Sequence, residues 1–151
     1  MEEITGTGIR FFSVPLDPEL RAAYERALYV VYGSPEVEFR IGEPSGVLDA
    51  MMETSHVATA AFVSTANKRG APTPENERRL ADFLLRSQLS GLAYRVCEGE
   101  GRDPLRIWPA EQSVLLMGIP RAEAEELGRR LAQNAIVFVE KGNAPELVVL
   151  V

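Results

Sequence analysis

The stretch ATAAFVSTANKRGAPTPENERRLADFLLRSQLSGL, residues 58–92, decides the fold because it combines a strand, a polar loop and a helix. Residues 58–63 are almost wholly apolar, which is typical of a central strand covered on both faces. Thr73 and Pro74 predict a helix start, with a capping side chain followed by proline at the first helical position. The apolar residues of this helix recur at i, i+3 and i+4 and make one buried face: Leu80, Phe83 and Leu84.

The rest of the chain alternates strands and helices in the order β-α-β-α-β-α-β-β-α-β-β. Residues 113–119 form a second strongly apolar strand, of which 114–117 should be central and buried. The end, residues 135–151, predicts a β-hairpin, and a glycine-rich acidic loop is expected over residues 98–104. We therefore expect a single α/β or α+β domain over residues 1–151, with helices packed on one mixed sheet.

Composition excludes several classes of protein. The formal net charge is −6, which argues against general nucleic-acid binding and against binding to anionic membranes. No apolar run approaches the roughly 20 residues that a membrane helix needs, and the start of the chain lacks the apolar core of a signal peptide. Cys97 is the single cysteine, so no internal disulfide is possible and a reducing, cytoplasmic location is expected. One histidine and one cysteine make no zinc site, and no metal is expected.

Several segments, in order and spacing, resemble a bacterial family, domain of unknown function 3293. They are AFVSTAN, PENERR, the EGEG segment, WPAEQSVLLMG and QNAIV, and the resemblance covers most of the chain from about residue 37 onward. The chain departs from the family pattern around the first asparagine, where Ala66 and Lys68 replace an aromatic residue and a proline. The resemblance implies no activity.

Polar residues recur where the predicted strands enter or leave loops, which is where open sheets gather ligands. We take eight of them as tentative ligand-binding residues: Thr65, Asn67, Asn76, Arg79, Glu98, Glu111, Gln133 and Asn134.

Each candidate also has a purely structural explanation. Asn67 suits a turn, and Asn134 suits a left-handed helix end. Asn76 and Arg79 lie one turn apart, a pattern that suits an anion, but it equally suits a helix cap with an ion pair to Glu75.

The acidic residues around the glycine-rich segment suit a hard cation or acid–base chemistry, yet a solvated loop is the simpler explanation. Trp108 is expected to close over the core, with the cover of a pocket as the alternative. Cys97 is expected to be a small buried hydrophobe rather than a nucleophile.

Two functions follow from this pattern. The first is a binding or interaction module for an unknown small molecule or protein, which the lack of a recognisable nucleophile–base pair favours. The alternative is an enzyme with a polar site near Asn67, Arg79 and Glu111. No cofactor is indicated. The apolar terminal segment ELVVLV is expected to be buried against the sheet or in a homodimer interface.

Overall fold

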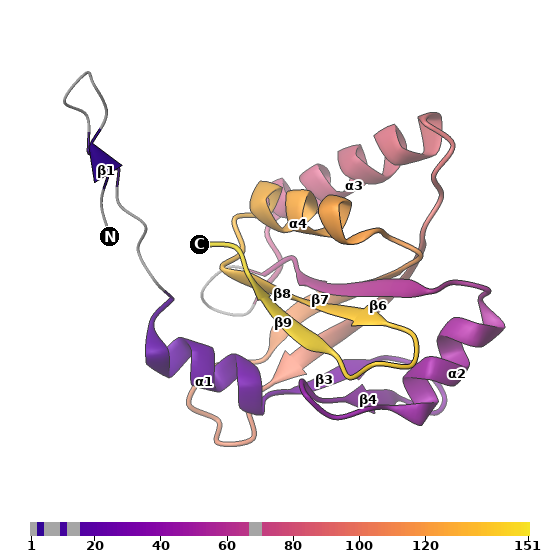
Figure 1. The fold of residues 1–151 in the computed structure, drawn as a ribbon, viewed down its shortest axis with the longest axis horizontal. Helices are drawn as coiled ribbons and strands as arrows, with labels where there is room; N and C mark the ends of the chain where they lie inside the picture. The colour runs from indigo at the N-terminus through magenta and orange to yellow at the C-terminus, as the bar shows by residue number, and fades with distance from the viewer. Residues whose placement is uncertain (1–2, 5–9, 12–15, 67–70) are drawn as a thin grey trace.

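The computed structural model describes residues 3–4, 10–11, 16–66 and 71–151. Within them it contains a seven-stranded sheet with helices on both faces (Figure 1). A separate two-stranded antiparallel sheet pairs β1 (Glu3–Ile4) with β2 (Arg10–Phe11). The expected single α+β domain with packed helices is confirmed.

The helices and strands of the main body follow one another as the sequence predicts, with one strand added after the first helix. Its helices are α1 (Pro18–Arg26), α2 (Gly46–Thr54), α3 (Pro74–Leu89) and α4 (Arg121–Arg130). Its strands are β3 (Leu28–Val31), β4 (Val37–Phe39), β5 (Thr59–Ser64), β6 (Arg95–Arg102), β7 (Glu111–Met117), β8 (Ala135–Glu140) and β9 (Glu146–Val149).

Three helices begin at the capping residues that the sequence contains. The side chains of Asp17, Ser45 and Thr73 accept hydrogen bonds from backbone N–H groups in the first turns of α1, α2 and α3. These contacts satisfy donors that a helix start leaves without an intrahelical partner.

The strand order is β4-β3-β6-β7-β5-β8-β9, and every pairing in this sheet is antiparallel. β5 lies between β7 and β8, and β7 lies between β6 and β5, so the prediction that these two strands are central and buried is confirmed. The mixture of strand directions expected from the βαβ pattern is not found. The crossovers through α3 and α4 instead each join two strands that run in the same direction but have one antiparallel strand between them.

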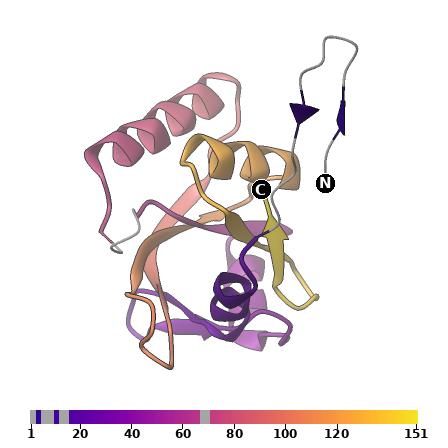
Figure 2. The same cartoon turned by 90° about the vertical axis from the view of Figure 1, so that its left-hand side faces the viewer.

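The segment β5-α3-β6-β7-α4-β8 has the strand order of a split β-α-β unit, also called ferredoxin-like. In it β7 separates β5 from β6, and β5 separates β7 from β8. Both crossover helices, α3 and α4, lie on the same face of the sheet (Figures 1 and 2). Apolar side chains on that face form one core with Phe83 of α3, Leu127 of α4 and Leu131, which directly follows α4.

The opposite face of the sheet encloses a second core. It contains the stacked and edge-on rings of Tyr29, Phe39 and Phe62, covered by Leu48 and Met52 of α2. The sheet curls around this core far enough that the Gly42 N–H, after β4, donates to the Pro145 carbonyl, before β9, at 2.8 Å. Segments flanking the two edge strands therefore meet.

Glycines in β6 allow part of this close packing. A Cβ on Gly99 would lie 2.0 Å from the Val30 carbonyl oxygen of β3 and 3.2 Å from the Phe62 ring. The glycine-rich acidic loop expected over residues 98–104 is therefore wrong for its first part, because residues 98–102 belong to β6. They complete the β6–β7 hairpin, which pairs Gly101 with Glu111.

The C-terminal hairpin is confirmed, since β8 pairs with β9. β9 is an edge strand, in which Val148 is buried and Leu147 and Val149 are half-buried. Leu150 also packs against the core under α3 and α4. Among the described residues, no helix has both the length and the apolarity that a membrane span requires.

Candidate functional site

A cavity of about 70 Å³ lies at the end of the curled sheet where α1 packs over it. Its apolar wall comes from α1, from the inner face of the sheet and from the segment after β6: Leu20, Tyr24, Tyr29, Phe62, Trp108, Pro109 and Leu147. Polar groups from the strand ends complete the lining: Ser64, Glu111, Ser113 and Gln133. A mainly apolar pocket with a few convergent polar groups is the usual form of a small-molecule site.

Glu111 is the acidic residue of the cavity with the most unusual surroundings. It opens β7 on the same face as Ser113 and Leu115, and the alternation of the strand therefore turns it toward the cavity. Among the described residues, no group donates a hydrogen bond to its carboxylate. Burial raises the pKa of Glu111 above its ordinary value. The carboxyl group is thus poised to gain a proton or a hydrogen-bond donor.

Tyr24 of α1 forms another part of the wall and lies within electrostatic range of Glu111. Burial raises the pKa of the Tyr24 phenol to about 12, the charge of Glu111 acts in the same direction, and a hydrogen bond with the Asn134 side chain opposes both. The Tyr29 hydroxyl donates to the Tyr24 carbonyl at 2.6 Å, which ties the helix to β3. Burial also raises the pKa of the Tyr29 phenol, so both phenols remain protonated at neutral pH.

The two serines and Gln133 are engaged with backbone. Ser64 Oγ accepts from the Ala66 N–H at 3.0 Å and donates to the Gln112 carbonyl at 3.2 Å, and Ser113 Oγ donates to the Glu111 carbonyl at 3.0 Å. Gln133 Nε2 donates to the carbonyls of Ala66 and Leu131. These contacts fix the strand ends around the cavity.

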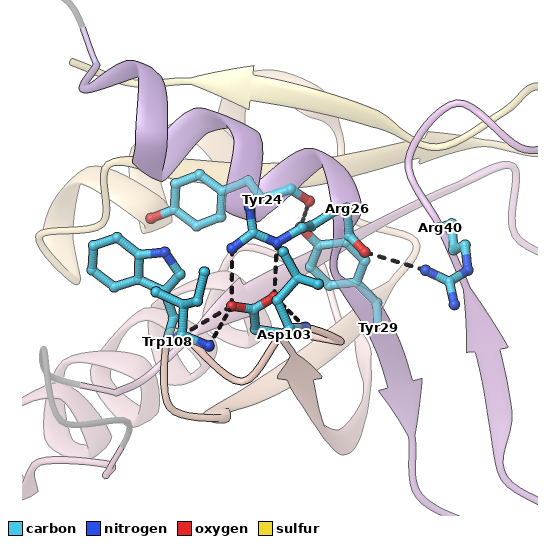
Figure 3. Close-up of polar contacts among 8 residues, drawn as sticks. Tyr24, Arg26, Tyr29, Arg40, Asp103 and Trp108 are labelled. Atoms are coloured by element: carbon cyan, nitrogen blue, oxygen red, sulfur yellow. Dashed lines mark hydrogen bonds and ion pairs between the residues drawn. The ribbon is translucent and has the colours of Figure 1, made fainter.

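Asp103 organises the segment that carries Trp108 (Figure 3). Its carboxylate accepts Arg26 Nε at 2.8 Å and Nη2 at 3.0 Å, and it accepts three backbone N–H groups, from Leu105, Ile107 and Trp108. Arg26 and these N–H groups hold the pKa of Asp103 well below its usual range. The ring of Trp108 is thereby placed beside that of Tyr24 at the cavity.

The structure brings only part of the predicted residue set to this cavity. Glu111 and Gln133 line it, and Asn134 reaches its edge through Tyr24. Thr65 and Glu98 instead line a separate surface depression beside α3, where Thr65 is buried and Glu98 is exposed. Asn67 lies outside the described residues.

Asn76 has a clear structural role. It is buried, and its side-chain amide donates to the carbonyls of Leu131 at 3.2 Å and Thr65 at 3.5 Å, which links α3 to the ends of α4 and β5. Arg79 donates to the Asn76 side chain at 3.3 Å and forms an ion pair with Glu75, the contact expected from the helix spacing.

Other expectations need correction or a smaller role. The left-handed residue after α4 is Ala132, with φ of 57°, and not Asn134. The acidic residues around β6 do not converge: within the described residues, no group of three or more His, Cys, Asp or Glu side chains is placed to hold a metal. Trp108 is 38% exposed and lines the cavity, as in the alternative expectation of a pocket cover.

Tyr24 is the residue of the cavity that sequence reasoning missed as a site residue. It lies in the apolar stripe of α1, and its helical spacing in the sequence is the same as that of a core residue. Ser113 is similarly hidden in an apolar strand, although the resemblance to the family includes it.

The comparisons support the family and nothing further. Residues 63–136 match the family model described as "Protein of unknown function (DUF3293)", which confirms the predicted resemblance. The matched segment contains Trp108, Glu111, Ser113 and Gln133 but not Tyr24 of α1. No curated protein and no solved structure shows significant similarity to the chain.

Proposed function

We propose that the protein, whose residues 63–136 match the model of the family DUF3293, binds a small molecule in the cavity beneath α1, with Glu111 as the group that recognises it. The observation that carries this proposal is the half-buried Glu111 carboxyl group, which no described residue contacts with a hydrogen-bond donor. A carboxylate removed from water without a partner is costly, so proteins rarely keep one without a use for it.

The lining indicates the chemistry of the ligand. A carboxylate between aromatic rings favours a cationic group or a group with several N–H donors, because both form charge-assisted hydrogen bonds to it. The cavity volume of about 70 Å³ is smaller than the roughly 150 Å³ of a cavity that admits benzene. It therefore takes an amidine-sized head group, while the rest of the ligand lies outside against Trp108.

The raised pKa of Glu111 also favours a second candidate, an enzyme that uses this carboxyl group for proton transfer. General acid–base catalysis works best when the pKa lies near the working pH, and burial moves Glu111 in that direction. Binding through Glu111 is common to both candidates.

A cytoplasmic location and the absence of general nucleic-acid binding remain part of this proposal, motivated by the single cysteine and the net charge of −6.

Benzamidine and benzoate test the proposal as a pair, since they share a ring and differ in the charge of the head group. The chain has one tryptophan, so its indole N–H gives a single NMR signal at the cavity. We expect benzamidine to shift this signal in a saturable way and benzoate to leave it unchanged.

The variants Glu111→Gln and Glu98→Gln complete the design, because both remove one carboxylate but only Glu111 lines the cavity. Benzamidine binding should weaken at least about tenfold in Glu111→Gln, the expected scale for a charge-assisted contact. It should be unchanged in Glu98→Gln. If benzamidine fails to shift the Trp108 signal up to its solubility limit, or if it binds both variants equally, the proposal is wrong.

A further inference from the structure

A second feature lies on the opposite side of the sheet from α1 and α2, on the outer surface of α3 and α4. Four arginines line one hollow of about 440 Å³: Arg79 and Arg86 of α3, and Arg129 and Arg130 of α4. Asp82 is the single acidic residue of the lining, so the lining carries a formal charge of +3 from four arginines and one aspartate. The hollow thus uses four of the 16 lysines and arginines of a chain whose net charge is −6.

The existing ion pairs leave these guanidinium groups partly exposed and able to contact a further anion. Arg79, Arg129 and Arg130 pair with Glu75, Glu125 and Glu126, each four residues earlier on its own helix. The three arginine side chains remain between 36% and 58% exposed, and such exposed pairs contribute little to stability. Their glutamates do not line the hollow. Among the described residues, no carboxylate pairs with Arg86.

Helix geometry explains the presence of some of these residues but not their convergence. Arg86, Arg129 and Arg130 lie in the last turns of their helices, where positive charge complements the helix dipole. Arg79 lies in the first half of α3, where the dipole gives no such preference. Three of these four guanidinium groups have a carboxylate partner on their own helix, which reduces their mutual repulsion, and an anion bound among all four would reduce it further.

We propose that this hollow binds a small molecule that carries two or more phosphate groups. The planar guanidinium group matches phosphate oxygens with two parallel hydrogen bonds, and arginines on two helices reach adjacent phosphates from both sides. The size of the hollow fits a small ligand. The acidic net charge opposes the long-range attraction on which binding to nucleic-acid polymers depends.

Tripolyphosphate is a suitable probe, with binding measured by isothermal titration calorimetry at low ionic strength. We expect one tripolyphosphate per chain and an affinity that falls as salt is added, because exposed charges are screened. The double variant Arg86→Gln/Arg130→Gln should weaken binding at least about tenfold. Arg79→Gln serves as a further variant if the double variant melts early.

Arg21→Gln/Arg95→Gln is the matched control, since it removes the same charge from exposed positions outside the hollow. It should leave the affinity for tripolyphosphate unchanged. Lack of tripolyphosphate binding would overturn the proposal, and so would equal weakening by both double variants, which would indicate a response to net charge alone. A short single-stranded oligonucleotide is the last arm: if it binds and tripolyphosphate does not, the ligand is a nucleic acid and the proposal is wrong.

Discussion

Two acidic residues that line the same cavity have opposite environments. Asp103 accepts five hydrogen bonds from Arg26 and three backbone N–H groups, and its pKa is lowered. Glu111 has no such donor among the described residues, and burial raises its pKa. Pairs of acids whose pKa values are pushed apart in this way are a common mark of a functional site. Asp103 builds the wall, and Glu111 is the residue that we propose for ligand binding.

Glu111→Gln should change how stability depends on pH. Because the pKa of Glu111 is higher in the folded than in the unfolded protein, the folded state holds the extra proton between the two values. The free energy of unfolding of the wild type should therefore fall as pH rises above the ordinary value of 4.5 and through the folded-state pKa. Glutamine cannot ionise, so the free energy of unfolding of Glu111→Gln should not show this decrease.

Thermal melts of the two proteins across this range measure the effect. The midpoint of Glu111→Gln should rise relative to the wild type as pH increases, because other groups titrate alike in both proteins. A difference that stays constant with pH, or that shrinks as pH rises, would show that Glu111 is not destabilised by burial.

Asn76→Ala should destabilise the fold, in contrast to a binding-site residue. The change removes the hydrogen bonds of the Asn76 side chain to the Leu131 and Thr65 carbonyls, leaves Gln133 as the side-chain donor to Leu131, and weakens the link between α3 and α4. We expect a loss of about 1–3 kcal/mol in urea unfolding, the usual scale for the loss of two buried hydrogen bonds. Gln88→Ala, at an exposed position of the same helix, should stay within about 0.5 kcal/mol of wild type. Equal losses in the two variants would contradict the role assigned to Asn76.

Single residues differ in how far the sequence reveals them. Glu111 and Gln133 are visible because polar groups interrupt apolar patterns at strand ends. Tyr24 and Trp108 are not distinguishable from core residues, since the wall of an apolar cavity and the core have the same composition. The sequence pattern predicts Asn76 as a binding residue, but its side chain donates to the Leu131 carbonyl. These two residues lie 55 positions apart, so no local sequence pattern predicts the contact.

At the scale of elements, the sequence predicts the helices better than the strand that borders the site. Helix starts depend on caps and prolines within a few residues, and these are local signals. β6 is hidden because Gly99 and Gly101 suggest a loop. Glycine at position 99 is needed for contact with β3, which is distant in sequence.

Gly99→Ala tests this explanation of β6. The added Cβ would lie 2.0 Å from the Val30 carbonyl oxygen, so the strands must separate. We expect a loss of about 1–3 kcal/mol in chemical unfolding, the usual cost of overpacking. Gly46→Ala is the control, because no atom lies within 4 Å of its added Cβ. It should be neutral or stabilising, since alanine favours the start of α2. A Gly99→Ala protein as stable as the control would show that the close approach is not required.

At the scale of the whole molecule, the curl of the sheet creates the cavity. The strand order depends on pairings between distant segments, such as β5 with β7 and β8, and these leave no trace in local sequence. The alternation of helices and strands led us to expect both parallel and antiparallel strand pairs. A wholly antiparallel sheet is compatible with the same order of helices and strands. α1 then closes the end of the curl, where Tyr24 and Glu111 line the same cavity.

The oligomeric state is a prediction that belongs to this scale. β9 pairs only with β8 and leaves its outer edge without a strand among the described residues. An edge of this kind favours pairing with a second copy. We therefore expect a dimer by multi-angle light scattering, and a monomer at all concentrations would contradict this expectation.

The pKa of the Glu111 side chain, measured by carbon-13 NMR with and without benzamidine, tests the central claim most directly. We predict a pKa above the ordinary value of 4.5 in the free protein. We also predict a fall in this pKa when benzamidine binds, because a cation beside the carboxylate stabilises its charged form. An ordinary pKa in the free protein, or a raised pKa that benzamidine leaves unchanged at saturation, would contradict the claim that Glu111 is the recognition group of the cavity.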